Sequence, residues 1–178
     1  MANFVRAVGL VALVMAVAAC GDIEDSGAGA DQPIPVIAQG RTGGPLPDEG
    51  CTWSLTPIAD MQGLTRDGVT LERVDSSGGS GGSYVWREDD DDVVWIHMET
   101  FCVDAPTFVF GGVSDDVGSV VLTSGDEQVV LDVLDVPNRS WGAVIGELPR
   151  GWRSAGSFRV EAISKSDGAV LARESYPI

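Results

Sequence analysis

The apolar residues of this chain form one long run at the amino terminus and many short runs after it. The long run covers residues 7–19 and contains no polar side chain. From residue 51 onwards the runs are short, are separated by Gly, Ser and Asp, and show no helical repeat. Short apolar runs between turn residues are typical of β-strands. We therefore expect strands at residues 52–55, 69–74, 83–88, 93–103, 107–110, 119–123, 128–136, 141–146, 157–164 and 169–174.

These strands predict an all-β fold, because many short strands with Gly-rich turns favour an antiparallel β-sandwich. Residues 124–127 and 165–168 are expected to be turns between neighbouring strands. Apolar and charged residues alternate along residues 158–162, as a strand with one buried face requires. We expect one β-sandwich domain from Cys51 to Ile178 with an immunoglobulin-like topology; the alternative is a Greek-key β-barrel.

The amino-terminal run has the three parts of a secretory signal peptide. Arg6 gives a short positive region, an apolar core follows, and small residues precede a cleavage site after residue 19. A transmembrane helix is the alternative, but it needs about 20 apolar residues, and this run stops at Cys20-Gly21-Asp22. We therefore expect residues 1–19 to be removed on export.

The run ends in Val17-Ala18-Ala19-Cys20, which resembles the lipobox of bacterial lipoproteins. That resemblance implies a diacylglycerol bound to Cys20 through a thioether, followed by cleavage before Cys20. Two or more acyl chains anchor a protein stably. The mature protein is then exported and held on the extracytoplasmic side of a cell membrane, or of an outer membrane if the cell has one.

The segment after the lipidated cysteine has the composition of a flexible tether. Residues 21–50 contain 7 Gly, 4 Pro and 6 acidic residues without helical or strand periodicity. Such a stretch buries too little apolar surface to offset the entropy of ordering. We therefore expect residues 20–50 to be a tether. Ile34, Val36 and Ile37 could form a short edge strand, but the nearby prolines disfavour it.

Two cysteines, Cys51 and Cys102, remain once Cys20 is lipidated. An exported protein meets an oxidising compartment, where disulfides persist. We expect these two residues to form a disulfide; two free buried thiols are the alternative. A zinc site is disfavoured because the chain has a single histidine.

The charge of the chain excludes one class of partner. It has 11 basic and 27 acidic residues, for a formal net charge of −16. Nucleic acids and anionic lipid surfaces attract basic proteins. We therefore expect no nucleic-acid partner and no electrostatic attachment to membranes, so that the lipid on Cys20 is the membrane anchor.

An aromatic cluster on residues 84–97 is the candidate binding face. The stretch reads as a hairpin with an acidic tip, in which Trp86 lies opposite Trp95 and Tyr84 opposite His97. Side chains two apart share a strand face, so these four would form one surface. An exposed face of this kind could stack on sugars or on partner side chains. The alternative is that the same face belongs to the sandwich core, where aromatic residues are common.

The acidic tip could instead bind a cation. Asp89, Asp90, Asp91 and Asp92 follow Glu88 directly, and calcium accepts such oxygen ligands. Consecutive residues cannot all point at one ion, however, and the spaced acids of an EF-hand are absent. Aspartate also favours turns, so a solvated acidic turn is the alternative, and we expect no other cofactor.

No catalytic signature appears in the sequence. The chain has a single histidine, and although Gly78 to Gly82 spell Gly-x-Ser-x-Gly, no helix is expected after them as a nucleophile elbow requires. The Gly-rich residues 76–83 also lack the lysine of a phosphate loop. Paired carboxylates keep a glycan-directed hydrolase as a less favoured alternative. The leading hypothesis is a lipid-anchored, non-catalytic binding or accessory protein whose partner is an envelope protein or a glycan. The second is a structural or regulatory lipoprotein stabilised by calcium.

Overall fold

A computed structural model describes residues 34–42, 51–58, 67–75, 78–100 and 107–178. In these ranges one short 3-10 helix, η1 (Arg150–Ser154), accompanies the strands. The strands are β1 (Ala38–Thr42), β2 (Cys51–Pro57), β3 (Gly68–Asp75), β4 (Ser80–Trp86), β5 (Val94–Thr100), β6 (Thr107–Val113), β7 (Val117–Ser124), β8 (Glu127–Asp132), β9 (Leu134–Asp135), β10 (Gly142–Glu147), β11 (Ser157–Ser164) and β12 (Val170–Pro177).

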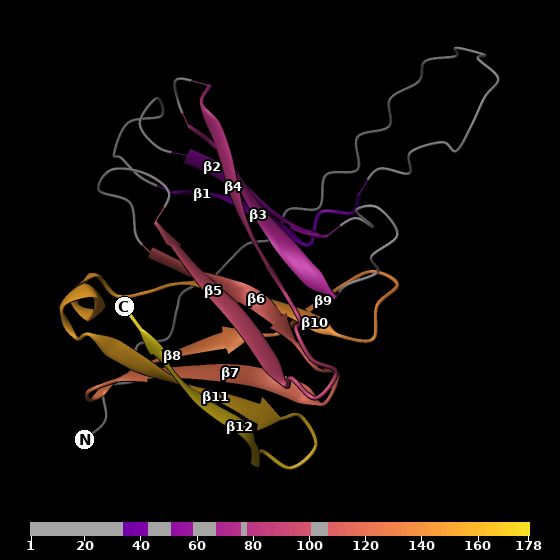
Figure 1. Ribbon diagram of the computed structural model, residues 1–178, viewed down its shortest axis with the longest axis vertical. Coiled ribbons are helices and arrows are strands. Elements are labelled where there is room, and N and C mark those ends of the chain that lie inside the picture. The colour runs from indigo at the N-terminus through magenta and orange to yellow at the C-terminus, as the bar shows by residue number, and fades with distance from the viewer. Residues whose placement is uncertain (1–33, 43–50, 59–66, 76–77, 101–106) are drawn as a thin grey trace.

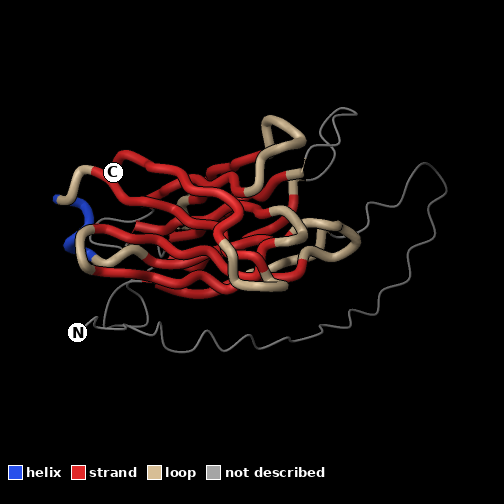
Figure 2. Tube along the Cα trace, turned by 90° about the horizontal axis from the view of Figure 1, so that it is seen from below, coloured by secondary structure: helices blue, strands red, loops and turns tan. Residues whose placement is uncertain are grey.

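The strands form three antiparallel sheets stacked in layers (Figure 1). The N-terminal sheet has the order β1-β2-β3-β4, the middle sheet β5-β6-β10-β9, and the C-terminal sheet β12-β11-β7-β8. Figure 2 shows the strands running side by side, with η1 at one end. The all-β antiparallel sandwich is therefore confirmed, with three layers. None of the sheets closes within the described residues, so the barrel alternative is wrong.

The middle and C-terminal sheets follow the immunoglobulin-like strand order. When β5 to β12 are lettered A, B, C, C′, D, E, F and G, the two sheets read A-B-E-D and G-F-C-C′, as in that class of sandwich. The expected topology thus holds for residues 94–178. The N-terminal sheet is a simple meander outside that scheme, and it packs on the free face of the middle sheet.

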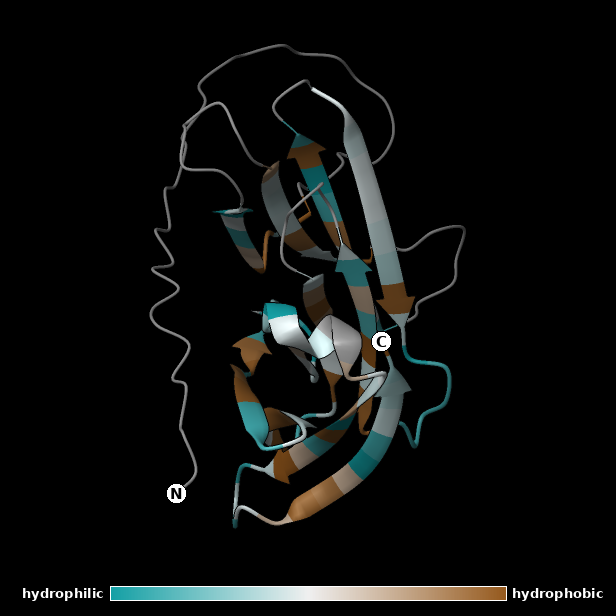
Figure 3. Cartoon of the chain, turned by 90° about the vertical axis from the view of Figure 1, so that its left-hand side faces the viewer, coloured by the Kyte–Doolittle hydropathy of each residue, from teal (hydrophilic) through white to brown (hydrophobic). Residues whose placement is uncertain are grey.

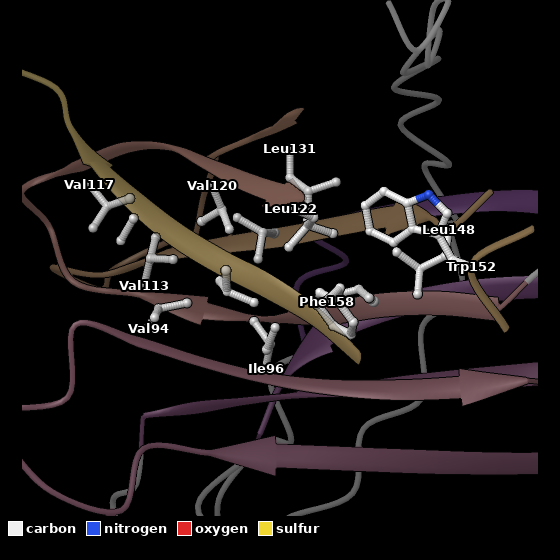
Figure 4. Close-up of a cluster of buried hydrophobic side chains, with 14 residues drawn as sticks. Val94, Ile96, Val113, Val117, Val120, Leu122, Leu131, Leu148, Trp152 and Phe158 are labelled. Carbon is white, nitrogen blue, oxygen red and sulfur yellow. The ribbon is translucent and has the colours of Figure 1, made fainter. Parts of the chain in front are cut away.

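Two apolar cores hold the three layers together. The core between the middle and C-terminal sheets includes Ile96, Val120 and Trp152 (Figure 4). The core between the N-terminal and middle sheets includes Leu71 and Phe110. The middle sheet is therefore covered on both faces, and all seven residues of β6 are buried.

β1 lies inside the segment expected to be a tether. It pairs with β2 from Ala38 opposite Leu55 to Thr42 opposite Cys51, and the Ile37 amide donates to the Leu55 carbonyl at 2.8 Å. The tether expectation for residues 20–50 is therefore wrong for this stretch. Gly40 gives the physical reason: a Cβ there would lie 2.6 Å from the Trp53 ring. Gly40 therefore leaves room for the ring of Trp53 in the core. Its segment resembles a linker in composition but forms a strand.

β4 and β5 do not form the expected hairpin. β4 pairs with β3 and β5 pairs with β6, so residues 87–93 cross from one sheet to the next. The pairing of Trp86 with Trp95, and of Tyr84 with His97, is wrong. Val94, Trp95 and Ile96 are all buried, because the first half of β5 is covered on both faces. Such a continuous apolar run is typical of a sheet between two layers.

Candidate binding surface

The N-terminal sheet has one buried and one solvent-facing side. Side chains alternate between the two faces of a strand. On β2, Trp53 and Leu55 are buried, whereas Thr52 is exposed and Ser54 is half-buried. On β3, Leu71 is buried and Glu72 is exposed. Hydrophobic and hydrophilic bands follow one another along several strands of the molecule (Figure 3). The solvent-facing side is therefore a sheet surface rich in hydroxyl groups.

A shallow trough lies on this surface. It encloses about 600 Å³, and its lining includes Gln39, Ser54, Thr70, Glu72, Gly82 and Tyr84. Every strand of the N-terminal sheet contributes to it. The trough therefore crosses the whole sheet, with Gln39 as the contribution of β1.

The strand register places these residues in two neighbouring rows. Gln39 lies opposite Ser54, Ser54 opposite Glu72, and Glu72 opposite Gly82. In the next row Thr70 lies opposite Tyr84. Side chains in adjacent rows of one face are neighbours. The Glu72 carboxylate, the Thr70 hydroxyl and the Tyr84 ring thus border the same part of the trough.

One wall of the trough is the ring of Tyr84, which stacks on Trp86. The rings of Tyr84 and Trp86 stack with centroids 5.0 Å apart and planes inclined by 14°. Tyr84 lines the trough and is 57% exposed, more than any other large hydrophobic side chain in the described ranges. Because Trp86 covers one face of the Tyr84 ring, the opposite face is the one that borders the trough.

Gly82 keeps the space beside this wall open. It stands two residues before Tyr84 on the same face of β4, where any other residue would place a side chain. A Cβ at Gly82 would lie 3.3 Å from the Leu71 carbonyl oxygen and 3.6 Å from Glu72 Cγ. A larger side chain here would therefore fill the gap between Glu72 and Tyr84.

Trp95, the third residue of the expected aromatic face, belongs to the core. It is 5% exposed and packs edge-on against Trp141, with centroids 5.9 Å apart. A Cβ on Gly112 would lie 2.4 Å from its ring, so the indole sits directly over that glycine. The core alternative is therefore right for Trp95, whereas Tyr84 is exposed.

His97, the fourth residue of that face, lies on β5 away from the aromatic pair. Its imidazole meets the Phe110 ring edge-on at 5.7 Å, and Nε2 lies 3.7 Å from the Glu99 carboxylate. Ser83 Oγ donates a hydrogen bond of 2.5 Å to the same carboxylate. Glu99 stands between the hydroxyl and the imidazole, so His97 is not placed to activate Ser83 as a nucleophile. The cluster ties β4 to β5.

The acidic residues 88–92 build a turn. Asp92 Oδ2 accepts hydrogen bonds from the amides of Glu88 at 3.2 Å and Asp89 at 3.0 Å, and the Arg87 guanidinium donates to the Asp90 carbonyl. No group of three or more His, Cys, Asp or Glu residues in the described part of the chain could hold a metal ion. The run Asp89, Asp90, Asp91 and Asp92 thus forms a hydrogen-bonded turn, and the calcium alternative stays a prediction.

A second hollow of about 520 Å³ lies at one end of the immunoglobulin-like sandwich. Its lining includes Asp115, Asp135, Arg139 and Lys165. The charges are mixed, and the Lys165 ammonium already donates to the Asp115 carbonyl. Trp141, the aromatic residue in its lining, is 5% exposed. This hollow offers no aromatic face, so the trough is the stronger candidate.

The predicted export features rest mainly on residues outside the described ranges. Cys20, the signal peptide and Cys102 all lie there, and their roles stay predictions. Cys51 is 1% exposed at the start of β2. Where the structure is described, no helix has the length and apolar character needed to cross a membrane.

The fold and surface together define an all-β protein in which an immunoglobulin-like sandwich carries a four-stranded sheet with one solvent-facing side. Comparison of the chain with protein-family models, with curated proteins and with solved structures finds no match.

Proposed function

We propose that this chain is a lipid-anchored, extracytoplasmic and non-catalytic binding protein. Its ligand lies in the trough on the N-terminal sheet. The observation that carries this proposal is Tyr84: a ring 57% exposed, stacked on Trp86, at the wall of a polar hollow. Tyrosine and tryptophan are enriched at interaction surfaces because each ring combines an apolar body with a polar tip, and tyrosine offers contact area with little loss of conformational freedom.

The trough supports binding more than hydrolysis. Glycoside hydrolysis needs two carboxyl groups about 5–9.5 Å apart across the scissile bond. Glu72 is the one carboxylate among the described residues that line the trough. Ser83 and His97 belong to the tie between β4 and β5 and lack the geometry of a nucleophile with its base. These arrangements favour a non-catalytic protein.

The lipobox-like residues 17–20 support the anchoring part of the proposal. The first strand of the described residues begins at Ala38, so the tether expected from composition ends before it. A random coil of roughly 18 residues would span about 20–25 Å on average. The net charge of −16 opposes contact with anionic lipid. The trough is therefore held near the membrane without lying on it.

Photo-crosslinking in the producing cells tests the binding surface. A photoreactive residue at position 84 should give a covalent adduct with the ligand. The control is the same residue at position 130, since Val130 is 43% exposed on β8 of the C-terminal sheet. Adducts of equal yield at both positions, or none at either, would contradict the proposed surface.

Substitution of the lipidated cysteine tests the anchor. Cys20→Ala should release the protein from the membrane fraction or leave the leader attached, and both outcomes change the mass of the mature chain. An unchanged mass together with an unchanged membrane fraction would contradict lipidation at Cys20.

A further inference from the structure

We infer that the ligand of this trough is an uncharged glycan chain. The inference rests on the proposed binding function and specifies the chemical class of its ligand. It follows from the stacking surface, the polar groups beside it and the charge around it.

The aromatic wall suits a sugar ring. A pyranose has one face of C–H groups, and such a face packs on an aromatic ring, while the hydroxyls at the edge of the sugar stay polar. Tyr84 presents one ring face to the trough, and Trp86 supports the other at 5.0 Å. The backing ring holds Tyr84 upright on the sheet, so that a sugar meets a preformed surface.

The floor of the trough matches the edge of a sugar. Sugar hydroxyls both donate and accept hydrogen bonds, and they need partners of both kinds. The Glu72 carboxylate accepts only, the hydroxyls of Ser54 and Thr70 do both, and the amide of Gln39 also does both. Glu72 faces the gap at Gly82 beside Tyr84. A ring stacked on Tyr84 therefore brings its hydroxyls to Glu72.

The dimensions favour a chain of sugars over one ring. The row from Gln39 to Gly82 crosses all four strands. Strands lie about 4.8 Å apart, so the row is roughly 14 Å long. A protein partner fits less well, because the cores of protein interfaces are depleted in serine and acidic residues, and Ser54 and Glu72 of the floor belong to those classes.

The charge selects neutral glycans. The lining of the trough includes one acidic residue, Glu72, and one basic residue, Arg73, so the selection rests on the whole chain, which carries a formal charge of −16. Such a field repels uronate, sulfate or phosphate groups on a polysaccharide. An uncharged polymer of hexoses or N-acetylhexosamines meets no such repulsion.

Calorimetric titration of the mature chain carrying Cys20→Ser tests the inference. The probes are hexamers of glucose and of N-acetylglucosamine, with a hexamer of galacturonate as the anionic comparison. At least one neutral hexamer should bind, and the galacturonate should not. Tyr84→Ala should weaken binding roughly tenfold or more. Glu72→Gln should weaken it several-fold, Gly82→Val should block it, and Val130→Ala should leave it unchanged. Thermal melts of each variant establish that it is folded.

Each outcome bears on the inference. Galacturonate binding as tightly as the neutral hexamers would overturn the ligand class. Neutral hexamers that bind Tyr84→Ala and Glu72→Gln as well as the parent would overturn the site. If no hexamer binds while position 84 crosslinks to a protein, the glycan is wrong and the binding surface remains. If no hexamer binds and nothing crosslinks, both proposals are wrong.

Discussion

The N-terminal sheet and the middle sheet are built from the same kind of strand but differ in how many faces are covered. Along β2, inward-facing residues are buried and those between them are exposed or half-buried. Along β6, every residue is buried. A sheet with one free face shows alternation, whereas a sheet between two layers shows continuous apolar residues. As an outer layer, the N-terminal sheet therefore has a face free for a ligand, whereas the middle sheet has none.

The largest expected effect is a difference in stability between variants of Trp95 and Tyr84, which the sequence alone placed on one surface. Trp95→Ala empties a site in the core between the sheets and should lower the free energy of unfolding by about 3–5 kcal/mol. Tyr84→Ala removes an exposed ring and should change it by no more than about 0.5 kcal/mol. Urea unfolding of both variants measures the difference, and equal effects would contradict the placement of the two rings.

The next effect concerns the proposed disulfide between Cys51 and Cys102, which would link the N-terminal sheet to the segment after β5. Closing a loop of about 50 residues contributes roughly 4 kcal/mol on the chain-entropy model. Cys51→Ser should therefore lower the midpoint of urea unfolding strongly. Reducing agent should do the same to the parent chain and leave the variant nearly unchanged. Labelling of two thiols in the denatured, unreduced protein would contradict the bond.

A smaller effect is expected at the end of the sandwich. Trp152 Nε1 donates a hydrogen bond of 2.7 Å to Glu127 and holds η1 against β8. Trp152→Phe removes this donor and should cost about 1–3 kcal/mol, since the acceptor is charged. Trp141→Phe is the matched control in the core beneath the N-terminal sheet, where the buried Nε1 of Trp141 has no hydrogen-bond partner among the described residues, so the same change should cost less. A larger loss in Trp141→Phe than in Trp152→Phe would contradict this expectation.

The smallest expected effect is a loss of stability at alkaline pH that depends on Tyr176. Burial, together with a hydrogen bond of 2.5 Å to Glu174, raises the pKa of Tyr176 far above its ordinary value of 10.0. The stability that this tyrosine contributes is therefore present below pH 10 and lost as the pH rises beyond it. Tyr176→Phe should flatten the fall of stability in that range. An unchanged alkaline profile in the variant would contradict the raised pKa.

Local pattern in the sequence predicted much of the fold. The strand at residues 157–164 has the expected bounds, and both expected turns contain a glycine with positive φ, Gly125 and Gly168. β1 escaped prediction because its role depends on Trp53, a residue distant in sequence that packs over Gly40. The expected strand at 128–136 is divided into β8 and β9, because the chain passes there from the C-terminal sheet to the middle sheet.

The candidate site was predicted only in part. Tyr84 and Trp86 share a face as expected, because that relation is local to one strand. Their relation to Trp95 and His97 depended on strand pairing, which alternation alone does not specify. The polar floor was missed, since serine and threonine on an exposed strand face are ordinary. The alternation along β2 was the signal that could have revealed it.

The position of β1 has a mechanical consequence. If the chain is anchored through Cys20, any pull between the membrane and a bound ligand enters the fold at β1, whose hold on β2 is five residue pairs. Gln39 belongs to this strand and also lines the trough. Tension that separates β1 from β2 would open one side of the trough before it reached the sandwich. A force on the tether would therefore weaken ligand binding through this short strand.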